Sequence, residues 1–327
     1  MKKLLYILVF LGMSACSEDF LEIFPETTLN EGNFYQTQEE FILLANGCYV
    51  PMRDYEKDLH WVLAELISDN TSFQYNIRTG EAVRGVIDQF IITSDNRGYA
   101  QFWDGSYNGI TRCNKLLAEI DREGVTWTDQ AYKERSTAEA LFLRGLYYFN
   151  LVRQFGGVPL VTTPITAQEA VNIDRATEEQ VYQQIINDLE SAVNHFSNAT
   201  SVDEDGRANK YAAQALLGKV FLYEGKNSQA AAELAVVNGT PGGTSIYGYK
   251  LLDNFSDLWE IADKFNSEAI IEISHTDQSN ADWGFWGSGA DEGNSVNVMV
   301  GPRGYSKPSG SDAPDYASGW SFDTVTQ

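Results

Sequence analysis

The segment from Asp129 to Phe155 constrains the fold more than any other part of the chain, because it is apolar on two opposite sides. At the 3.6-residue period of a helix, apolar residues line two stripes: Ala138, Leu141, Phe142, Gly145, Phe149 and Val152 on one, and Leu143, Leu146, Tyr147 and Leu151 on the other. A helix that is apolar all round has to be buried by its neighbours. Gly156-Gly157-Val158-Pro159 ends it, since glycine accepts a left-handed cap and proline cannot continue a helix. We therefore predict a central helix in a mainly α domain.

Three further helices are indicated by apolar residues at three-and-four spacing. One begins near Gln38, a second covers Gly98 to Asp121, and a third opens at Thr177. Their stripes consist of Phe41, Leu44, Ala45 and Cys48; Trp103, Tyr107, Ile110, Asn114, Leu117 and Ile120; and Val181, Ile185, Leu189, Ala192 and Phe196. Thr177 is the predicted N-cap of the third helix, because a threonine followed by acids suits a helix start.

The stretch from Tyr211 to Val237 matches a tetratricopeptide repeat, in which two helices cross at small side chains. The matching residues are Leu217, Gly218, Phe221, Gly225, Ala230, Leu234 and Val237. Gln214 departs from the repeat where tryptophan is preferred, and Gly242 departs where proline usually closes the unit. The helix pairs 99–121 with 130–155 and 177–196 with 209–225 have compatible lengths. The predicted fold is therefore a tetratricopeptide-like helical-repeat scaffold.

Two long stretches lack helical periodicity. Asp69 to Asp95 is expected to be an irregular loop that ends in a strand-like piece over Val86 to Ile92. Ser267 to Ser274 alternates like a strand, and residues 276–321 are rich in Gly, Ser, Asn and Asp. Loops of such length are either functional or disordered. We expect long irregular ligand-binding loops and a few short strands.

Both stretches combine aromatic rings with hydrogen-bonding side chains. A sugar packs its C–H groups on a ring face and bonds its hydroxyls to acids, amides or arginine. The candidate ligand residues are Asp69, Asn70, Phe73, Tyr75 and Arg78 in the first loop (69–78), and Trp283, Phe285, Trp286 and Tyr305 in the second (283–305). The alternative for each ring is that it packs on the scaffold and holds its loop in place.

The first 15 residues read as an export signal, with Lys2 and Lys3 before an apolar run from Leu4 to Leu11. As a helix this run spans only about 12 Å, against a hydrocarbon core of about 30 Å. The ending Leu-Gly-Met-Ser-Ala-Cys resembles a bacterial lipobox, which implies that Cys16 is lipidated and that 16–38 is a tether. The alternative is a plain secretory signal. Two or three acyl chains would anchor the protein stably.

The charge balance excludes nucleic acid as a partner. Loss of Lys2 and Lys3 with the leader takes the formal net charge from −23 to −25, and no basic cluster offsets the acids. The oxidation state of Cys48 and Cys113 stays open, since either a bridge or two free thiols would suit two cysteines in an exported chain.

Sequence motifs of catalysis are missing. The three histidines, at positions 60, 195 and 275, lack metal-ligand spacing, and the sequence has no nucleophile elbow or phosphate-binding glycine loop. We therefore expect no metal, no cofactor and no catalytic residue. A glycoside hydrolase remains a possible alternative, because two acids about 5–10 Å apart would suffice for that chemistry.

Four segments together resemble the SusD-like (RagB/SusD) nutrient-binding lipoproteins of Gram-negative bacteria. They are Cys16-Ser-Glu-Asp-Phe-Leu-Glu, TAEALFLRGLYYFNLVRQFGGVPLV (137–161), RATEEQVYQQIINDLESAV (175–193) and GRANKYAAQALLGKVFLYEGK (206–226). The resemblance implies tetratricopeptide-like units that hold an oligosaccharide or similar nutrient in surface loops, without catalysis. It also implies a lipid-anchored place on the outer face of the outer membrane, as the lid of a SusC-like TonB-dependent transporter.

Members of this family continue beyond the position that corresponds to Gln327. The resemblance therefore implies that 39–327 is the N-terminal part of a SusD-like helical domain whose C-terminal part is missing from this sequence. A different reading of the same scaffold is a helical-repeat protein that binds only protein partners.

Overall fold

The computed structural model describes residues 34–54, 64–68, 70–73, 82–199, 205–274, 303–313, 318–319 and 324–325. The predicted leader, Cys16 and most of the tether lie outside the described residues, so export and lipidation stay predictions. Among the residues that are described, no helix is both long enough and apolar enough to cross a membrane.

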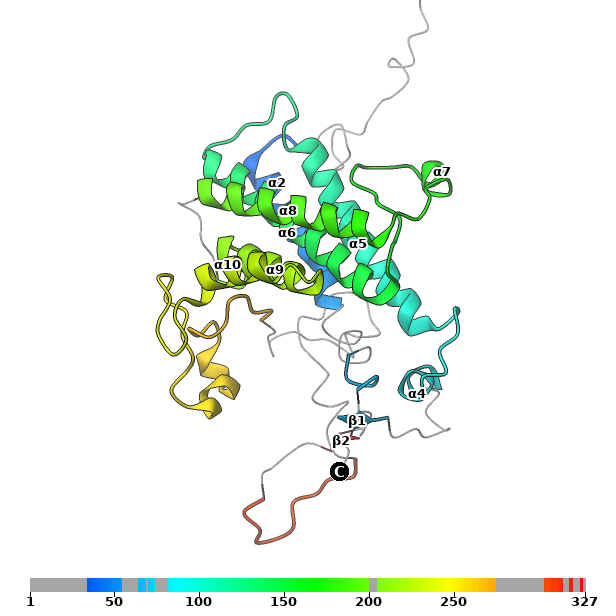
Figure 1. Ribbon diagram of the computed structural model, residues 1–327, viewed down its shortest axis with the longest axis vertical. Coiled ribbons are helices and arrows are strands. Elements are labelled where there is room, and N and C mark those ends of the chain that lie inside the picture. Colours follow the sequence, from blue (N-terminus) through cyan, green and yellow to red (C-terminus); the bar gives the residue numbers. More distant parts are fainter. Residues whose placement is uncertain are drawn as a thin grey trace, which may run out of the picture.

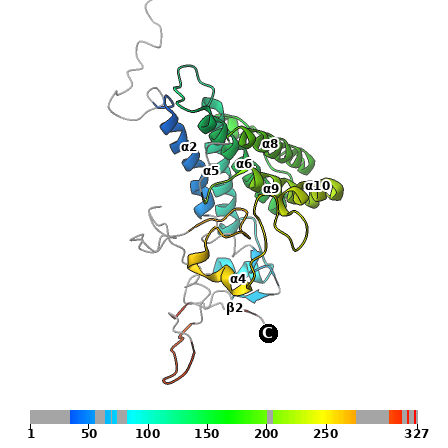
Figure 2. The same ribbon diagram turned by 90° about the vertical axis from the view of Figure 1, so that its left-hand side faces the viewer.

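The fold is mainly helical, as predicted (Figure 1). Its long helices are α2 (Gln38–Asp54), α5 (Arg97–Glu119), α6 (Gln130–Phe155), α8 (Glu178–Asn198), α9 (Lys210–Tyr223) and α10 (Asn227–Asn238). The short elements are α4 (Ala82–Asp88), α7 (Ala167–Ala170), the 3-10 helices η4 (Phe255–Trp259) and η5 (Ile261–Asp263), and the strands β1 (Thr71–Ser72) and β2 (Thr324–Val325). Figure 2 shows the long helices in succession, from α2 and α5 to α9 and α10.

Helix α6 is the centre of the molecule, as its two apolar stripes predicted. It packs against α2, α5, α8 and α9. Phe142 and Leu143, which belong to opposite stripes, are 2% and 0% exposed. Asp129 caps the start of α6 by accepting a hydrogen bond from the Ala131 N–H at 2.8 Å, and Gly156 ends it with a φ of +68°. Both ends are thus set by local chemistry.

Small residues allow the helices to approach closely, which is the feature that the repeat match predicted. A Cβ on Gly218 of α9 would lie 2.7 Å from the Leu234 side chain of α10. A Cβ on Gly109 of α5 would lie 2.2 Å from the Tyr147 ring of α6. Successive helices therefore pack as neighbouring pairs, and the tetratricopeptide-like scaffold is confirmed.

The strand-like piece predicted over Val86 to Ile92 is wrong. Residues up to Asp88 form α4, and the chain then turns. The Ile91 N–H donates to the Val86 carbonyl at 2.9 Å, while Phe90 takes a left-handed φ of +56°. This is the hydrogen-bond pattern of a helix C-terminus. Ile87 is fully buried against the start of α5. The apolar run around it therefore resembled a buried strand in the sequence, although its residues form a helix end and a turn.

The strand predicted over Ser267 to Ser274 is also wrong. In the described part of the chain this segment has no strand partner, and β1 pairs with β2 instead. Its isoleucines at 270, 271 and 273 pack on the helical core from an irregular backbone. An apolar alternating sequence forms a strand only where another strand completes the ladder.

Cys48 of α2 and Cys113 of α5 are both free thiols and fully buried, which decides between the two alternatives for this structure. Burial and the neighbouring Cys48 thiol raise the pKa of the Cys113 thiol well above its ordinary value. A thiol held protonated in this way packs as a small apolar side chain.

Candidate functional site

The strand pair β1–β2 lies at one end of the molecule and includes part of the first predicted loop (Figure 1). β1 lies within the first loop, 69–78, and β2 follows the second loop along the chain. The pairing is antiparallel, with Thr71 opposite Val325 and Ser72 opposite Thr324. Figure 1 shows β1, β2 and the 303–313 segment below the helix bundle. The pairing therefore joins part of the first loop to residues 324–325, although the two segments are far apart along the chain.

The predicted ligand residues in the described part of the chain have different surroundings. Asn70 is exposed, Tyr305 is partly exposed, and Phe73 is only 6% exposed within the hydrophobic core. The Phe73 ring therefore plugs its loop against the scaffold and does not offer a face to a sugar. The other predicted residues lie outside the described residues: Asp69, Tyr75, Arg78, Trp283, Phe285 and Trp286.

Hydroxyl groups shape the turn that presents Asn70. Ser68 Oγ and Thr71 Oγ1 both donate to the Glu65 carbonyl, at 2.7 and 2.8 Å. The Asn70 N–H donates to Ser68 Oγ at 3.2 Å. Serine and threonine form such local turns because their hydroxyls can replace backbone partners. The composition of this loop does not predict the turn, because the Glu65 carbonyl that both hydroxyls contact lies outside the loop.

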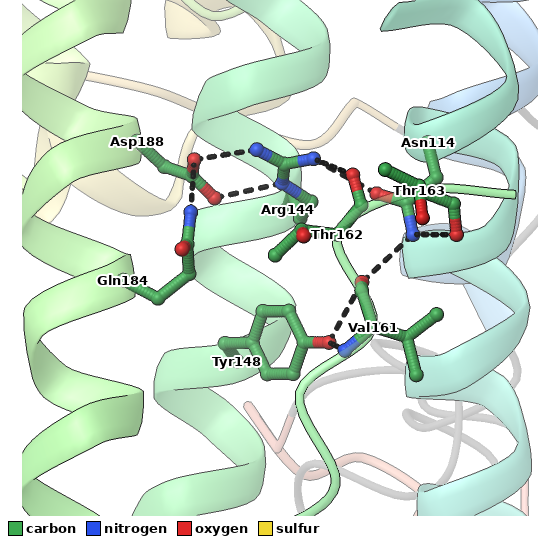
Figure 3. Close-up of polar contacts among 8 residues, drawn as sticks. All are labelled: Asn114, Arg144, Tyr148, Val161, Thr162, Thr163, Gln184 and Asp188. Carbon is green, nitrogen blue, oxygen red and sulfur yellow. Dashed lines mark hydrogen bonds and ion pairs between the residues drawn. The ribbon is translucent and has the colours of Figure 1, made fainter. Parts of the chain in front are cut away.

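A buried polar cluster holds the chain after α6 against the scaffold (Figure 3). Arg144 of α6 forms a two-pronged ion pair with Asp188 of α8, at 2.8 Å (Nε–Oδ2) and 2.6 Å (Nη2–Oδ1). Its Nη1 donates to Asn114 Oδ1 of α5 at 2.8 Å and to the Thr162 carbonyl at 3.0 Å. Asn114 in turn donates to the Val161 carbonyl at 2.7 Å. The cluster joins three helices to one connecting segment.

The chemistry of this cluster is structural. Burial disfavours the charged guanidinium, but Asp188 outweighs that effect and raises the pKa of Arg144 above its ordinary value. Burial also raises the pKa of Tyr148 to about 12, and its hydroxyl both donates to the Val161 carbonyl and accepts from the Val161 N–H. Groups that are paired and held in one protonation state at neutral pH stabilise a fold and offer no proton for catalysis.

A second buried ion cluster centres on Glu139 of α6, which is 0% exposed. It accepts from Arg207, just before α9, at 2.8 Å (Nε–Oε1) and 2.5 Å (Nη2–Oε2), and from Arg135 Nε at 3.1 Å. Arg207 also donates to Asn46 of α2. Arg207 and Asn46 are distant from Glu139 along the chain, so no local pattern predicts that they meet in this cluster.

A cavity of about 190 Å³ lies in the segment that follows α10. It is lined by Leu258, Glu260, Asp263, Lys264, Asn266, Glu268, Ala269 and Glu272. The Glu268 and Glu272 carboxylates accept hydrogen bonds from the backbone N–H groups of Leu252 and Phe265, at 2.9 and 2.8 Å. Within the described ranges, no group of acids, histidines or cysteines is arranged to hold a metal ion.

A family model for SusD-like proteins, described as starch-binding and associating with the outer membrane, matches residues 19–222. The chain belongs to the SusD-like family. The match ends in α9, so it covers the scaffold and leaves out the second predicted loop. The predicted family membership is thereby confirmed.

Solved structures agree with this assignment. A laminarin-binding SusD-like protein is 42% identical with a TM-score of 0.80, over 89% of this chain and 63% of that one. Surface glycan-binding protein A of Bacteroides thetaiotaomicron, solved with laminarihexaose, is 21% identical with a TM-score of 0.72, over 89% of this chain and 60% of that one. At such low identity the second likeness shows the fold alone.

Curated relatives are longer than this chain. A SusD-like protein of Formosa agariphila is 25% identical over 284 residues, which are 83% of this chain and 51% of the relative. A SusD-like protein of Bacteroides ovatus is 25% identical over 270 residues, or 80% of this chain and 47% of the relative. The chain thus spans about half the length of the curated relatives it matches.

Proposed function

We propose that this SusD-like chain binds an uncharged oligosaccharide of the laminarin type at the end of the molecule where β1 and β2 pair. The observation that most directly supports this proposal is the 42% identity, over 89% of the chain, to a laminarin-binding SusD-like protein. The proposed site uses Asn70 and Tyr305 together with Asp69, Tyr75, Arg78, Trp283, Phe285 and Trp286. Phe73 is left out because its ring is buried.

The charge of the protein favours a neutral ligand. The mature chain would carry a formal charge of −25, which repels polyanions unless Arg78 or Arg303 neutralises them. Laminarin is an uncharged polysaccharide, so its hydroxyl and C–H groups suit amides and aromatic rings. The ligand class and the composition of the loops therefore agree.

Calorimetry with laminarin oligosaccharides tests this function. Each indole that stacks on sugar should contribute about 1–2 kcal/mol by burying apolar surface. Trp283→Ala/Trp286→Ala should then weaken binding by about 10- to 1000-fold. Trp259→Ala is the matched control, because Trp259 is 73% exposed in η4 and lies outside the proposed site.

Equal affinities for the wild type and the Trp283/Trp286 double variant would place the site elsewhere. Binding of acidic oligosaccharides alone would contradict the charge argument. We propose binding without catalysis, so laminarin incubated with the protein should release no reducing sugar.

The proposal extends to anchoring and delivery. A lipid on Cys16 would hold the protein at the outer membrane, where it would pass ligand to a SusC-like TonB-dependent transporter. The family description supports the membrane association. Cys16→Ala should move the protein from the membrane fraction to the soluble fraction and abolish fatty-acid labelling. Label retained by this variant would show that another residue carries the lipid.

A further inference from the structure

Two buried thiols face one another between α2 and α5. Cys48 of α2 and Cys113 of α5 are both 0% exposed, and their thiols are hydrogen-bonded to each other. Such a contact requires each side chain to point toward the partner helix, which is the first geometric condition for a disulfide. Neither residue belongs to the proposed sugar site.

Hydrogen bonds beside the two thiols hold the helices together at this level. Arg112 of α5 donates from Nη1 to the Gly47 carbonyl of α2 at 3.0 Å. The Tyr147 hydroxyl of α6 donates to the Cys48 carbonyl at 2.8 Å. These contacts place Cys48 opposite Cys113 without involving a sulfur atom, so oxidation of the thiols leaves both hydrogen bonds available.

We propose that Cys48 and Cys113 form a disulfide when the chain folds in an oxidising compartment, and that the two free thiols of this structure are its reduced form. The inference rests on the proposed export of the chain, because such bonds persist outside the reducing cytosol. The bridge ties α2, the first helix after the predicted tether (16–38), to α5. It also encloses residues 49–112, and with them the first predicted loop (69–78), in a covalent ring.

The bridge forms by exchange with a second disulfide, either a small molecule or a thiol–disulfide oxidoreductase. The thiolate of one cysteine attacks a sulfur of the oxidant, which forms a mixed disulfide and releases one thiol of the oxidant. The thiolate of the other cysteine then attacks the protein sulfur of that mixed disulfide, closes the Cys48–Cys113 bond and releases the second thiol. The protein loses two protons and two electrons, and the oxidant takes up both as two thiols.

Burial determines when this exchange takes place. Both thiols are fully buried, and burial together with the Cys48 thiol raises the pKa of the Cys113 thiol well above its ordinary value. A buried, protonated thiol exchanges slowly, because the thiolate is the attacking form and needs access to the oxidant. The bridge therefore forms during folding, before α2 covers Cys113, and the folded dithiol resists oxidation.

Oxidative refolding of the purified full chain tests the proposal. The chain carries Cys16→Ala, so that Cys48 and Cys113 are its only thiols, and it is diluted from urea into a buffer of oxidised and reduced glutathione. After alkylation of free thiols, mass spectrometry should find the Cys48 peptide joined to the Cys113 peptide in most molecules. Protein that has first folded with its thiols reduced should form the bridge at least about tenfold more slowly in the same buffer.

The stability of the bridged chain gives an independent check. A bridge that fits the fold mainly restricts the unfolded chain, so it should lower the ratio of unfolded to folded protein at least about tenfold. The urea midpoint should therefore fall when a reductant is added. Cys113→Ala is the matched control, because its midpoint should be the same with and without reductant, and Cys48→Ala repeats the control from α2.

Two alkylated thiols or separate glutathione adducts after refolding would overturn the proposal. A bridged chain no more stable than the reduced chain would also overturn it, since the helices would then have to distort to accept the bond. Equal rates of bridging from the folded and unfolded chains would contradict formation during folding. The buffer supplies the oxidant and no sugar is present, so these results are independent of export and of the proposed sugar site.

Discussion

At the residue scale, the buried ions of α6 determine how its neighbours are placed. Arg144 is 6% exposed and Asp188 is 2% exposed, and each has the other as its ionic partner. Removing one member of such a pair leaves an uncompensated charge inside the protein, which is far more damaging than losing an exposed pair. The Arg144–Asp188 pair therefore fixes the packing of α6 on α8 and the path of the segment after α6.

Asp188→Asn tests the importance of this pair. The change keeps the shape of the side chain but removes its charge, so it should lower the free energy of unfolding by about 3–5 kcal/mol. Urea denaturation measures the difference. Glu190→Gln is the matched control on the same helix, because Glu190 is exposed and its loss should change stability by less than about 0.5 kcal/mol. Equal stabilities for the two variants would mean that Arg144 finds another partner.

Individual residues differ in how far the sequence predicts them. Phe142 and Leu143 were predicted to be buried, because a helical period reveals which positions face a core. The pairing of Arg144 with Asp188 could not be read from spacing, because it depends on how two helices dock. Phe73 shows the same limit, since composition alone does not separate a ring that plugs a loop from one that receives a ligand.

At the element scale, the close contact of α5 with α6 depends on Gly109. Gly109→Ala would place a methyl group 2.2 Å from the Tyr147 ring, so it should destabilise the protein by about 1–3 kcal/mol through overpacking. Gly105 lies one turn earlier on α5 with no neighbour within 4 Å of a Cβ. Gly105→Ala should therefore stabilise α5 by up to about 1 kcal/mol. Thermal denaturation of both variants separates these effects, and a shared direction of change would contradict the packing described.

Helices were predicted well and strands poorly, for a physical reason. Thr177 was predicted as an N-cap and forms a capping box with Gln180, because both partners are local. A strand needs a partner that can come from anywhere in the chain. The pairing of β1 with β2 places Thr71 opposite Val325, and no local sequence pattern predicts this pairing.

At the scale of the whole molecule, local sequence patterns predict the scaffold but do not predict how the loops of the proposed site are arranged. The helical scaffold follows from periodicity, caps and small residues at crossings, and the family match covers it up to α9. The proposed site depends on loops outside the helices, and β1 and β2 pair part of the first loop with residues 324–325. Composition alone indicates the two loops, and the ligand residues in them stay predictions.

Hydrogen–deuterium exchange with and without laminarin oligosaccharide tests this account most directly. Ligand binding at the β1–β2 end should slow exchange in residues 70–73 and 303–313, because bound sugar restrains the loops that contact it. Exchange in the core of α6 should stay unchanged, since that helix is already buried. Slower exchange confined to α9, α10 and residues 245–266, or no change anywhere at saturating oligosaccharide, would contradict the proposed site.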